Sequence, residues 1–312
     1  MAPLVLLVGC EASEGDSSPQ PGTTTLTTAL VTSADDGTTD ADDASDTAGS
    51  GADDATSAGS DDGVDDGTDD GPTGSGTGPD PETILFEEDF EGAGEGTVPA
   101  GWDSFVGYVV NMNNEPGGMA FALADGSRPR QGERSLHVVG GQTPAMLTRP
   151  FPPGVDRVYV RTYVWLTAKL GANPGNNHET LLGVRASVGQ ANDEVRFGEI
   201  KGVIGTNEVP TDDISPTMES WDRGPEITAG AWHCVEVAFV ADQPNHEVRA
   251  WSDGVEVHVV NDPSQWNNGA LGSDFLANKF NEFIIGWHSF SNFDNEVWFD
   301  DVIVATERVG CD

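Results

Sequence analysis

The stretch Val-Tyr-Val-Arg-Thr-Tyr-Val-Trp-Leu, residues 158–166, alternates two kinds of side chain with a period of two. Successive side chains of a β-strand point to opposite faces of its sheet. Val, Thr and Leu therefore share one face of this stretch, and Tyr, Arg and Trp share the other. The alternation predicts a strand whose two faces are both occupied.

Short alternating runs also precede and follow this stretch in the sequence, separated by Gly, Pro, Asn and Asp. Asp253-Gly254 supplies the positive φ that a tight hairpin needs. No stretch keeps a 3.6-residue apolar period for three turns, so the sequence predicts an all-β fold, an antiparallel jelly roll or β-sandwich, over residues 83–312. The other predicted strands are 84–86, 135–139, 180–184, 195–204, 234–240, 248–251, 255–259, 283–287 and 297–304.

Charge divides the chain into two parts. The 312 residues carry 53 acids and 14 bases, for a formal charge of −39. Residues 1–82 hold 19 acids and no Lys or Arg, so they account for −19, and residues 83–312 account for the other −20. Neither part is basic, which argues against nucleic acid as a partner. No apolar run reaches the roughly 18 residues of a transmembrane helix.

Residues 11–82 consist almost entirely of Asp, Gly, Thr, Ser and Ala. With so few apolar side chains the segment cannot offset its ordering entropy, and we predict a disordered acidic tether. Asp-rich repeats also suggest calcium-binding repeats, but the glycine spacing here is irregular. Weak surface binding of divalent ions is a further alternative.

Residues 1–10 form an apolar run that ends in Leu7-Val8-Gly9-Cys10. This resembles a bacterial lipobox, in which the apolar segment is removed and the cysteine is acylated. We therefore expect an exported protein, lipid-anchored through Cys10 at the bacterial outer membrane or cell surface. The alternative is an ordinary apolar N-terminus with an incidental cysteine, because the basic segment expected before the run is missing.

Cys234 and Cys311 are the remaining cysteines, one at the start of a predicted strand and one after the last strand. In an exported chain they are expected to form a disulfide that ties the C-terminus to the sheet. The alternative is a pair of buried thiols.

Several segments together resemble the fungal cellulose-induced jelly-roll proteins, relatives of glucuronan and alginate lyases with a concanavalin A-like sandwich. The resemblance covers about residues 83–311 and implies a secreted, polysaccharide-directed module with a structural calcium ion and a groove across one sheet. Its segments are Phe86–Gly92, Ser135–Gly141, Val158–Arg161, Asn177-His178, Asp212–Pro216, Trp232–Glu236 and Val297–Cys311.

The resemblance also implies the calcium ligands. They are the carboxylates of Glu91 and Asp300, together with backbone carbonyls of Gln131 and Arg134 in the loop before the strand at 135–139. A hard cation that takes six to eight oxygen ligands is compatible with this set plus water. The alternative is that both acids are solvated turn residues.

In the groove, Arg196 and Asp213 match the family. The family's histidine two places before that arginine is Glu194 here, and its glutamine four places after it is Ile200, so two usual polar groove residues are replaced. A lyase that removes the C5 proton of a uronic acid needs a group to neutralise the carboxylate, a base and an acid.

Three further residues are candidates for this chemistry beside Arg196, which would hold the carboxylate. His178 or Lys201 is a candidate base, and His288 is expected to reach the same groove. Strict alternation places Lys201 on the face opposite Arg196, unless a bulge at Gly198 or Gly202 shifts the register. The alternatives are an ordinary surface lysine and hydrogen-bonded structural histidines.

Five aromatic residues are candidates for sugar stacking, because an aromatic ring covers the apolar face of a pyranose. The alternative is that most of them fill the core or cover its rim. They are Tyr163, Trp165, Trp221, Trp266 and Trp287.

These observations predict a surface-displayed, monomeric polysaccharide-binding lipoprotein that carries a calcium ion and reaches the membrane only through its lipid anchor. The alternative is a polysaccharide lyase that cleaves a uronic-acid-containing glycan by β-elimination. The −20 charge of the folded part repels a polyuronate at long range, which favours neutral glycans.

Overall fold

The computed structural model describes residues 79–171, 178–188, 191–209, 214–215, 225–242, 246–266, 275–291 and 293–311. Within these ranges nearly all regular structure is β-strand, with two short 3-10 turns at Pro81–Thr83 and Pro263–Gln265. No helix in this part of the chain is long and apolar enough to cross a membrane. The all-β prediction is confirmed. Cys10, the predicted signal and the tether up to residue 78 lie outside the described residues.

Eight strands form one antiparallel sheet, called sheet A, in the order β14-β13-β12-β7-β16-β5-β4, with β1 paired to β16. The strands of sheet A are β1 (Ile84–Glu88), β4 (Phe121–Asp125), β5 (Ser135–Gly140), β7 (Arg157–Leu166), β12 (Trp232–Val240), β13 (Glu247–Ser252), β14 (Val255–Val260) and β16 (Asn295–Ala305).

The other eight strands form sheet B in the order β11-β10-β9-β8-β15-β6-β2-β3, again antiparallel throughout. Its strands are β2 (Asp103–Val106), β3 (Val109–Val110), β6 (Ala145–Val155), β8 (His178–Val188), β9 (Ala191–Ile200), β10 (Val203–Val209), β11 (Ile214–Ser215) and β15 (Phe280–Ser289).

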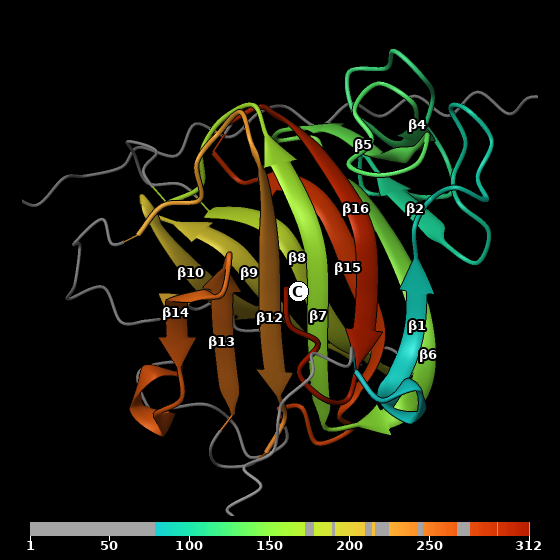
Figure 1. Ribbon diagram of the computed structural model, residues 1–312. Helices are drawn as coiled ribbons and strands as arrows, with labels where there is room; N and C mark the ends of the chain where they lie inside the picture. Colours follow the sequence, from blue (N-terminus) through green and yellow to red (C-terminus); the bar gives the residue numbers. More distant parts are fainter. Residues whose placement is uncertain are drawn as a thin grey trace, which may run out of the picture. The chain divides into compact units, whose positions relative to one another are not determined.

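The two sheets stack face to face, with sheet A toward the viewer and sheet B behind it in Figure 1. Their inner faces share one core, to which sheet A contributes Val160 and Val164, and sheet B contributes Phe197 and Phe283. Each of these side chains is at most 1% exposed. Burying a side chain of this size stabilises the fold by about 1.5–3 kcal/mol.

Strand β7 is the predicted two-faced strand, and it lies at the centre of sheet A. It pairs with β12 along its length, from Trp232↔Trp165 to Val240↔Arg157, and with β16 on its other edge. Its valines and leucine enter the core as predicted, and its aromatic residues point to the outer face of the sheet.

Three described hairpin turns have positive φ at both central residues, and one of them is Gly107-Tyr108, with φ of 60° and 66°, between β2 and β3. Asp253-Gly254, with φ of 49° and 79°, joins β13 to β14 as the sequence predicts. Lys201-Gly202, with φ of 52° and 86°, joins β9 to β10. The single strand predicted over 195–204 is therefore wrong, because the chain reverses at Lys201.

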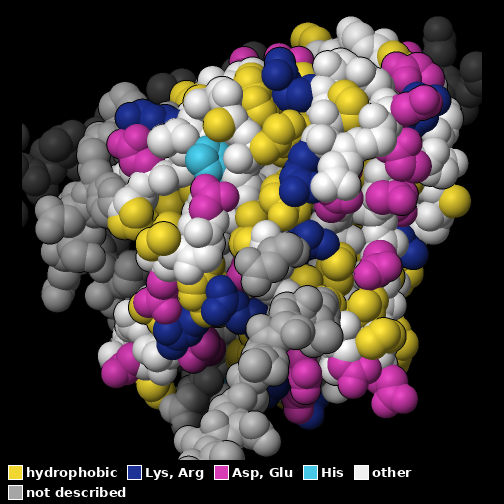
Figure 2. All heavy atoms as spheres, viewed as in Figure 1, with side chains coloured by type: hydrophobic (Ala, Val, Ile, Leu, Met, Phe, Trp, Pro, Cys, Tyr) yellow, Lys and Arg dark blue, Asp and Glu magenta, His cyan; other side chains and the backbone are white. Residues whose placement is uncertain are grey.

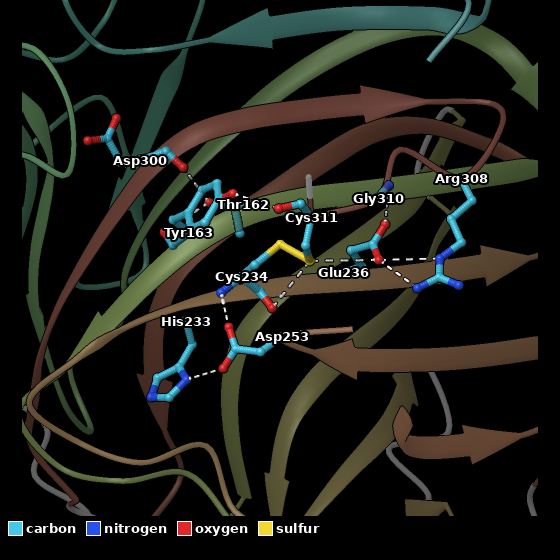
Figure 3. Close-up of a disulfide and its surroundings, with 10 residues drawn as sticks. All are labelled: Thr162, Tyr163, His233, Cys234, Glu236, Asp253, Asp300, Arg308, Gly310 and Cys311. Atoms are coloured by element: carbon cyan, nitrogen blue, oxygen red, sulfur yellow. Dashed lines mark hydrogen bonds and ion pairs between the residues drawn. A yellow bond between two sulfur atoms is a disulfide. The ribbon is translucent and has the colours of Figure 1, made fainter. Parts of the chain in front are cut away.

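The predicted disulfide is present, with 2.08 Å between the sulfurs of Cys234 and Cys311 (Figure 3). Hydrogen bonds hold the same C-terminal segment on the outer face of sheet A. The Tyr163 hydroxyl donates to the Cys311 carbonyl at 3.2 Å, and the Gly310 amide donates to Glu236 Oε1 at 2.7 Å. The Arg308 guanidinium donates to Glu236 Oε2 at 2.8 Å.

Candidate functional site

A hollow of about 240 Å³ lies on the outer face of sheet B. Strand β9 supplies Glu194 and Arg196 to its wall, while the alternating Val195 and Phe197 are buried in the core. The described residues that line the hollow are Phe105, Tyr108, Met146, Thr148, Thr180, Arg185, Glu194, Arg196, Ile284, His288 and Phe290.

A β-bulge in strand β8 brings polar side chains from both of its halves to this hollow. Opposite β9 the register of β8 shifts between Thr180 and Leu182. Leu181 and Leu182 are consecutive and both fully buried, so the alternation of faces moves by one residue at this point. Thr180 and Arg185 therefore line the same hollow although an odd number of positions separates them.

Strand β15 places His288 and Ile284 at the hollow and buries Phe283, Ile285 and Trp287 in the core. Tyr108 lies in the turn between β2 and β3, where its φ of 66° allows the chain to reverse direction. Its side chain is 60% exposed at the rim.

Two ion pairs lie side by side on the hollow's charged wall. Arg196 Nε is 2.6 Å from Glu194 Oε1, and Arg185 Nε is 2.6 Å from Glu282 Oε2. In the strand register Arg185 faces Glu282 on one side and Glu194 on the other. All four side chains are at least partly buried, so solvent screens these attractions less than at an open surface.

His288 is buried at the opposite wall, with Nε2 3.1 Å from the Tyr108 hydroxyl. The Tyr108 hydroxyl has one hydrogen, which it donates to the Gln142 carbonyl at 3.3 Å. Burial, and then the positive charge of Arg196, lower the pKa of His288 to about 4. The imidazole is therefore neutral near pH 7 and has one nitrogen able to accept a proton.

Phe290 links the two walls. Its ring centroid lies 3.9 Å from that of His288 and 6.3 Å from that of His178, and the Arg196 guanidinium is 5.5 Å from it. Of the four catalytic candidates, Arg196 and His288 line the hollow, and His178 lies beside it against Phe290. Lys201 sits instead in the β9–β10 turn and is not among the lining residues.

Tyr163 and Trp165 do not reach this hollow, because β7 presents them on the outer face of the other sheet. There the Arg130 guanidinium covers the Tyr163 ring at 3.3 Å, and the Arg128 guanidinium covers the Trp165 ring at 3.7 Å. Figure 2 shows hydrophobic and basic side chains side by side in the middle of this face.

The other aromatic candidates are buried or lie outside the described residues. Trp287 is fully buried, with its Nε1 donating to the Phe293 carbonyl at 3.1 Å. Trp266 is 1% exposed and donates to the His246 carbonyl at 2.9 Å. Trp221 and Asp213 fall outside the described part of the chain.

The two predicted calcium-binding carboxylates approach the same loop from opposite ends of the chain. Glu91 Oε1 accepts hydrogen bonds at 2.9 Å from the amides of Glu133 and Arg134. Asp300 Oδ2 accepts from the Arg130 amide at 2.8 Å, and Asp300 is 1% exposed. Among the described residues, no three His, Cys, Asp or Glu side chains gather closely enough to hold a metal ion.

Sequence reasoning did not identify Tyr108, Arg185, Glu282 or Phe290. Tyr108 lies in the turn between the short strands β2 and β3, and Phe290 directly follows β15; strand pairing brings these distant segments together. Arg185 reaches the hollow only because of the β8 bulge. Arg185, Glu194 and Glu282 each lie one residue beyond the end of a predicted strand, so the predicted bounds gave no signal for the two ion pairs.

A family model described as the Cip1-like core domain, of polysaccharide lyase-like type, matches residues 98–307. The chain belongs to this Cip1-like family. Among solved structures, the cellulose-induced protein Cip1 is 23% identical over 73% of this chain and 100% of its own, with a TM-score of 0.55. An alginate lyase, vAL-1 from a Chlorella virus, is 13% identical over 61% of this chain and 90% of its own, with a TM-score of 0.38.

The search of curated proteins finds no match. The Cip1-like family match confirms the resemblance drawn from residues 83–311, and the likeness to Cip1 confirms the sandwich fold. Membership of a polysaccharide lyase-like family links the chain to carbohydrate-directed proteins. Among the described residues, the hollow on sheet B brings charged, hydroxyl and aromatic side chains together.

Proposed function

We propose that the protein binds a uronic-acid-containing polysaccharide in the hollow on sheet B and cleaves it by β-elimination. The observation that carries the proposal is the arrangement of Arg196, His288 and Tyr108 around one hollow. Burial, and then the charge of Arg196, lower the pKa of His288, and His288 Nε2 lies 3.1 Å from the Tyr108 hydroxyl. These are a cation for the carboxylate, a neutral base and a hydroxyl acid.

Each group has one role in the reaction. Arg196 holds the uronate carboxylate and stabilises the negative charge that develops there as the C5–H bond breaks. The unprotonated nitrogen of His288 accepts the C5 proton. The electron pair forms the C4=C5 double bond, the C4–O bond breaks, and the Tyr108 hydroxyl protonates the leaving oxygen.

Substrate binding itself would adjust His288. In the free protein the charge of Arg196 helps to lower the pKa of His288 to about 4, which makes the imidazole a weak base. A uronate carboxylate on Arg196 cancels that charge, and its own negative charge favours the imidazolium. The smaller of the two causes of the low pKa is then removed, so the pKa of His288 shifts upward and the imidazole becomes a stronger base.

The test follows the ultraviolet absorbance of unsaturated uronate product with a panel of polyuronates and neutral glucans. We expect product from a uronate substrate, and a loss of about 10²-fold or more in kcat for His288→Gln and Tyr108→Phe. Arg196→Lys should also lose activity, because lysine lacks the planar fork of arginine. Arg249→Lys is the control, since Arg249 makes a similar ion pair on sheet A.

A second candidate function is polysaccharide binding without cleavage. Two exposed aromatic rings favour it, because Tyr108 is 60% exposed and Phe290 is 42% exposed at the rim of the hollow. Such rings stack on pyranose faces. Retention of a glycan in affinity electrophoresis with no unsaturated product, and loss of retention in Phe290→Ala, would replace the lyase proposal with this one.

We also propose that calcium binds between Glu91 and Asp300. The carboxylates suit a hard cation, and Asp300 is 1% exposed. Backbone carbonyls of Gln131 and Arg134 would complete the set of calcium ligands. The amides of the same loop donate to Glu91 and Asp300 in the structure. Chelation should lower the melting temperature and Glu91→Gln should abolish that effect. An unchanged midpoint with no metal in the purified protein would contradict the site.

Finally, we propose that Cys10 is acylated and anchors the protein at the bacterial outer membrane or cell surface. The apolar run ending in Leu7-Val8-Gly9-Cys10 supports this proposal. Mass spectrometry of the mature N-terminus from membrane extracts should find a lipid on Cys10. An unmodified cysteine in that fraction would exclude the anchor.

A further inference from the structure

We propose that the glycan recognised by this hollow is a heteropolysaccharide whose uronic acids are separated by neutral sugars, and that Glu194 and Glu282 set this preference. The inference rests on the proposed function of the same hollow. It goes further than that function, because it excludes as a substrate any polymer that has a carboxylate on every sugar.

The first argument is the charge of the hollow. Its described arginines are Arg185 and Arg196, and each lies 2.6 Å from a glutamate oxygen. With Glu194 and Glu282 the four charges sum to zero, and His288 is neutral near pH 7 because burial lowers its pKa to about 4. The folded part as a whole carries −20 by sequence. One carboxylate can be accommodated at Arg196, whereas a row of carboxylates has no matching row of cations.

The second argument is that the two ends of the hollow differ in polarity. Charged side chains come from β8 and β9, whereas Phe105 on β2 and Met146 on β6 supply the other end. Val110 on β3 pairs with Phe105 and is 58% exposed, so it extends this apolar surface. A carboxylate held there would lose water without gaining a counter-charge. The apolar face of a neutral sugar fits that surface instead.

Glu194 has the larger part in this preference. It is two residues from Arg196 on the same face of β9, and it also faces Arg185 in the strand register. A first uronate carboxylate must share Arg196 with Glu194. A second one finds only Arg185 as a further cation among the described lining residues, and Glu282 already pairs with it. Two carboxylates that share one guanidinium in a partly buried site repel each other strongly. Glu282 does not line the hollow itself and acts through Arg185, whose Nε lies 2.6 Å from Glu282 Oε2.

The experiment compares two soluble polymers, a homopolyglucuronate and an acidic heteropolysaccharide with one glucuronate per repeat and neutral sugars between. Product formation and affinity electrophoresis are measured at low and physiological salt for the wild-type chain, Glu194→Gln and Glu282→Gln. Glu247→Gln is the matched control, because Glu247 pairs with Arg249 two residues away on β13 of the other sheet.

We expect the wild-type protein to favour the heteropolymer at least tenfold in kcat/KM. Glu194→Gln should reduce that ratio by about fivefold or more, mainly by improving KM for the homopolymer, and Glu247→Gln should leave it unchanged. The ratio should also shrink as salt rises, since salt screens the repulsion.

Two failures remain distinguishable. Cleavage of the homopolymer at least as well as the heteropolymer would overturn the inference and leave the lyase proposal standing. If neither polymer yields product, the lyase proposal fails, and the retention of each polymer in electrophoresis then decides the inference by the same ratio. Equal retention, or a ratio insensitive to Glu194→Gln, would overturn it.

Discussion

Glu179 is a carboxylate held in nearly dry surroundings outside the catalytic groups. It is 3% exposed, and its neighbour across the β8–β9 ladder is Glu199, which is fully buried. The Ser289 hydroxyl donates to Glu179 Oε1 at 3.4 Å, and Oε2 has no hydrogen-bond partner among the described residues. Burial first, and then the negative charge of Glu199, raise the pKa of Glu179 to about 8. Glu179 is therefore protonated in the folded state near pH 7.

This shift predicts that stability falls as pH rises. The unfolded chain releases the Glu179 proton near its ordinary pKa of 4.5, whereas the folded chain keeps it up to about pH 8. Between these values the folded state binds more protons, so its stability falls by up to about 1.4 kcal/mol per pH unit. Glu179→Gln should remove this slope and stabilise the protein at pH 8 but hardly at pH 4.5. Urea unfolding at both pH values measures it.

Asp156→Asn is the control for this prediction. Asp156 pairs with Lys279 at 2.9 Å near the surface, and its side chain is 54% exposed. That hydrogen bond lowers its pKa, so Asp156 titrates below the pH window in question. A pH slope that persists unchanged in Glu179→Gln would show that another group causes it.

At the same scale, sequence reasoning found some site residues and misplaced others for a physical reason. Alternation correctly put Glu194 and Arg196 on one face of a strand, and the structure places both at the hollow. Alternation does not say which sheet a strand joins. Alternation therefore correctly placed Tyr163 and Trp165 on one face of their strand. That face lies on the opposite side of the sandwich from Arg196.

At the scale of elements, the sequence predicted neither the β9–β10 hairpin nor the β8 bulge. The hairpin turn is Lys201-Gly202, and lysine is an unusual first residue for a turn that needs positive φ at both positions. The β8 bulge involves two leucines that do not differ from ordinary core residues. Asp253-Gly254, by contrast, has the common sequence for such a turn and was predicted correctly.

The hairpin yields a prediction that also concerns the proposed mechanism. Lys201 has φ of 52°, where asparagine is tolerated well and a β-branched residue poorly. Lys201→Asn should therefore be more stable than Lys201→Val by about 1–2 kcal/mol. Both variants lose the lysine side chain, so the difference between them reports the backbone alone. Thermal unfolding measures it.

Activity of the same two variants tests the position of Lys201 in the turn. Because Lys201 is not among the lining residues, Lys201→Asn should keep the formation of unsaturated product. Loss of product in Lys201→Asn with an unchanged melting temperature would instead favour lysine as the base. Equal stability of the two variants would contradict the turn geometry.

At the scale of the whole molecule, the two outer faces of the sandwich have different roles. The outer face of sheet A holds the C-terminal segment through the disulfide, Glu236 and Tyr163 (Figure 3). The outer face of sheet B carries the hollow. The described apolar side chains between them form one continuous core.

This division predicts that removing the disulfide lowers stability without changing the chemistry of the hollow. The bond joins residues separated by 77 positions, and the chain-entropy model assigns such a closure about 4.5 kcal/mol. The double variant Cys234→Ala/Cys311→Ala should therefore lose roughly 2–5 kcal/mol in urea unfolding. Hydrogen bonds from Gly310 and Arg308 to Glu236 hold the segment in place, so the folded variant should keep its kcat.

Glu236→Gln in the double-alanine background should then release the C-terminus, which limited proteolysis would detect. A fall in kcat on disulfide removal, at a urea concentration where the protein is still folded, would mean that the faces are coupled.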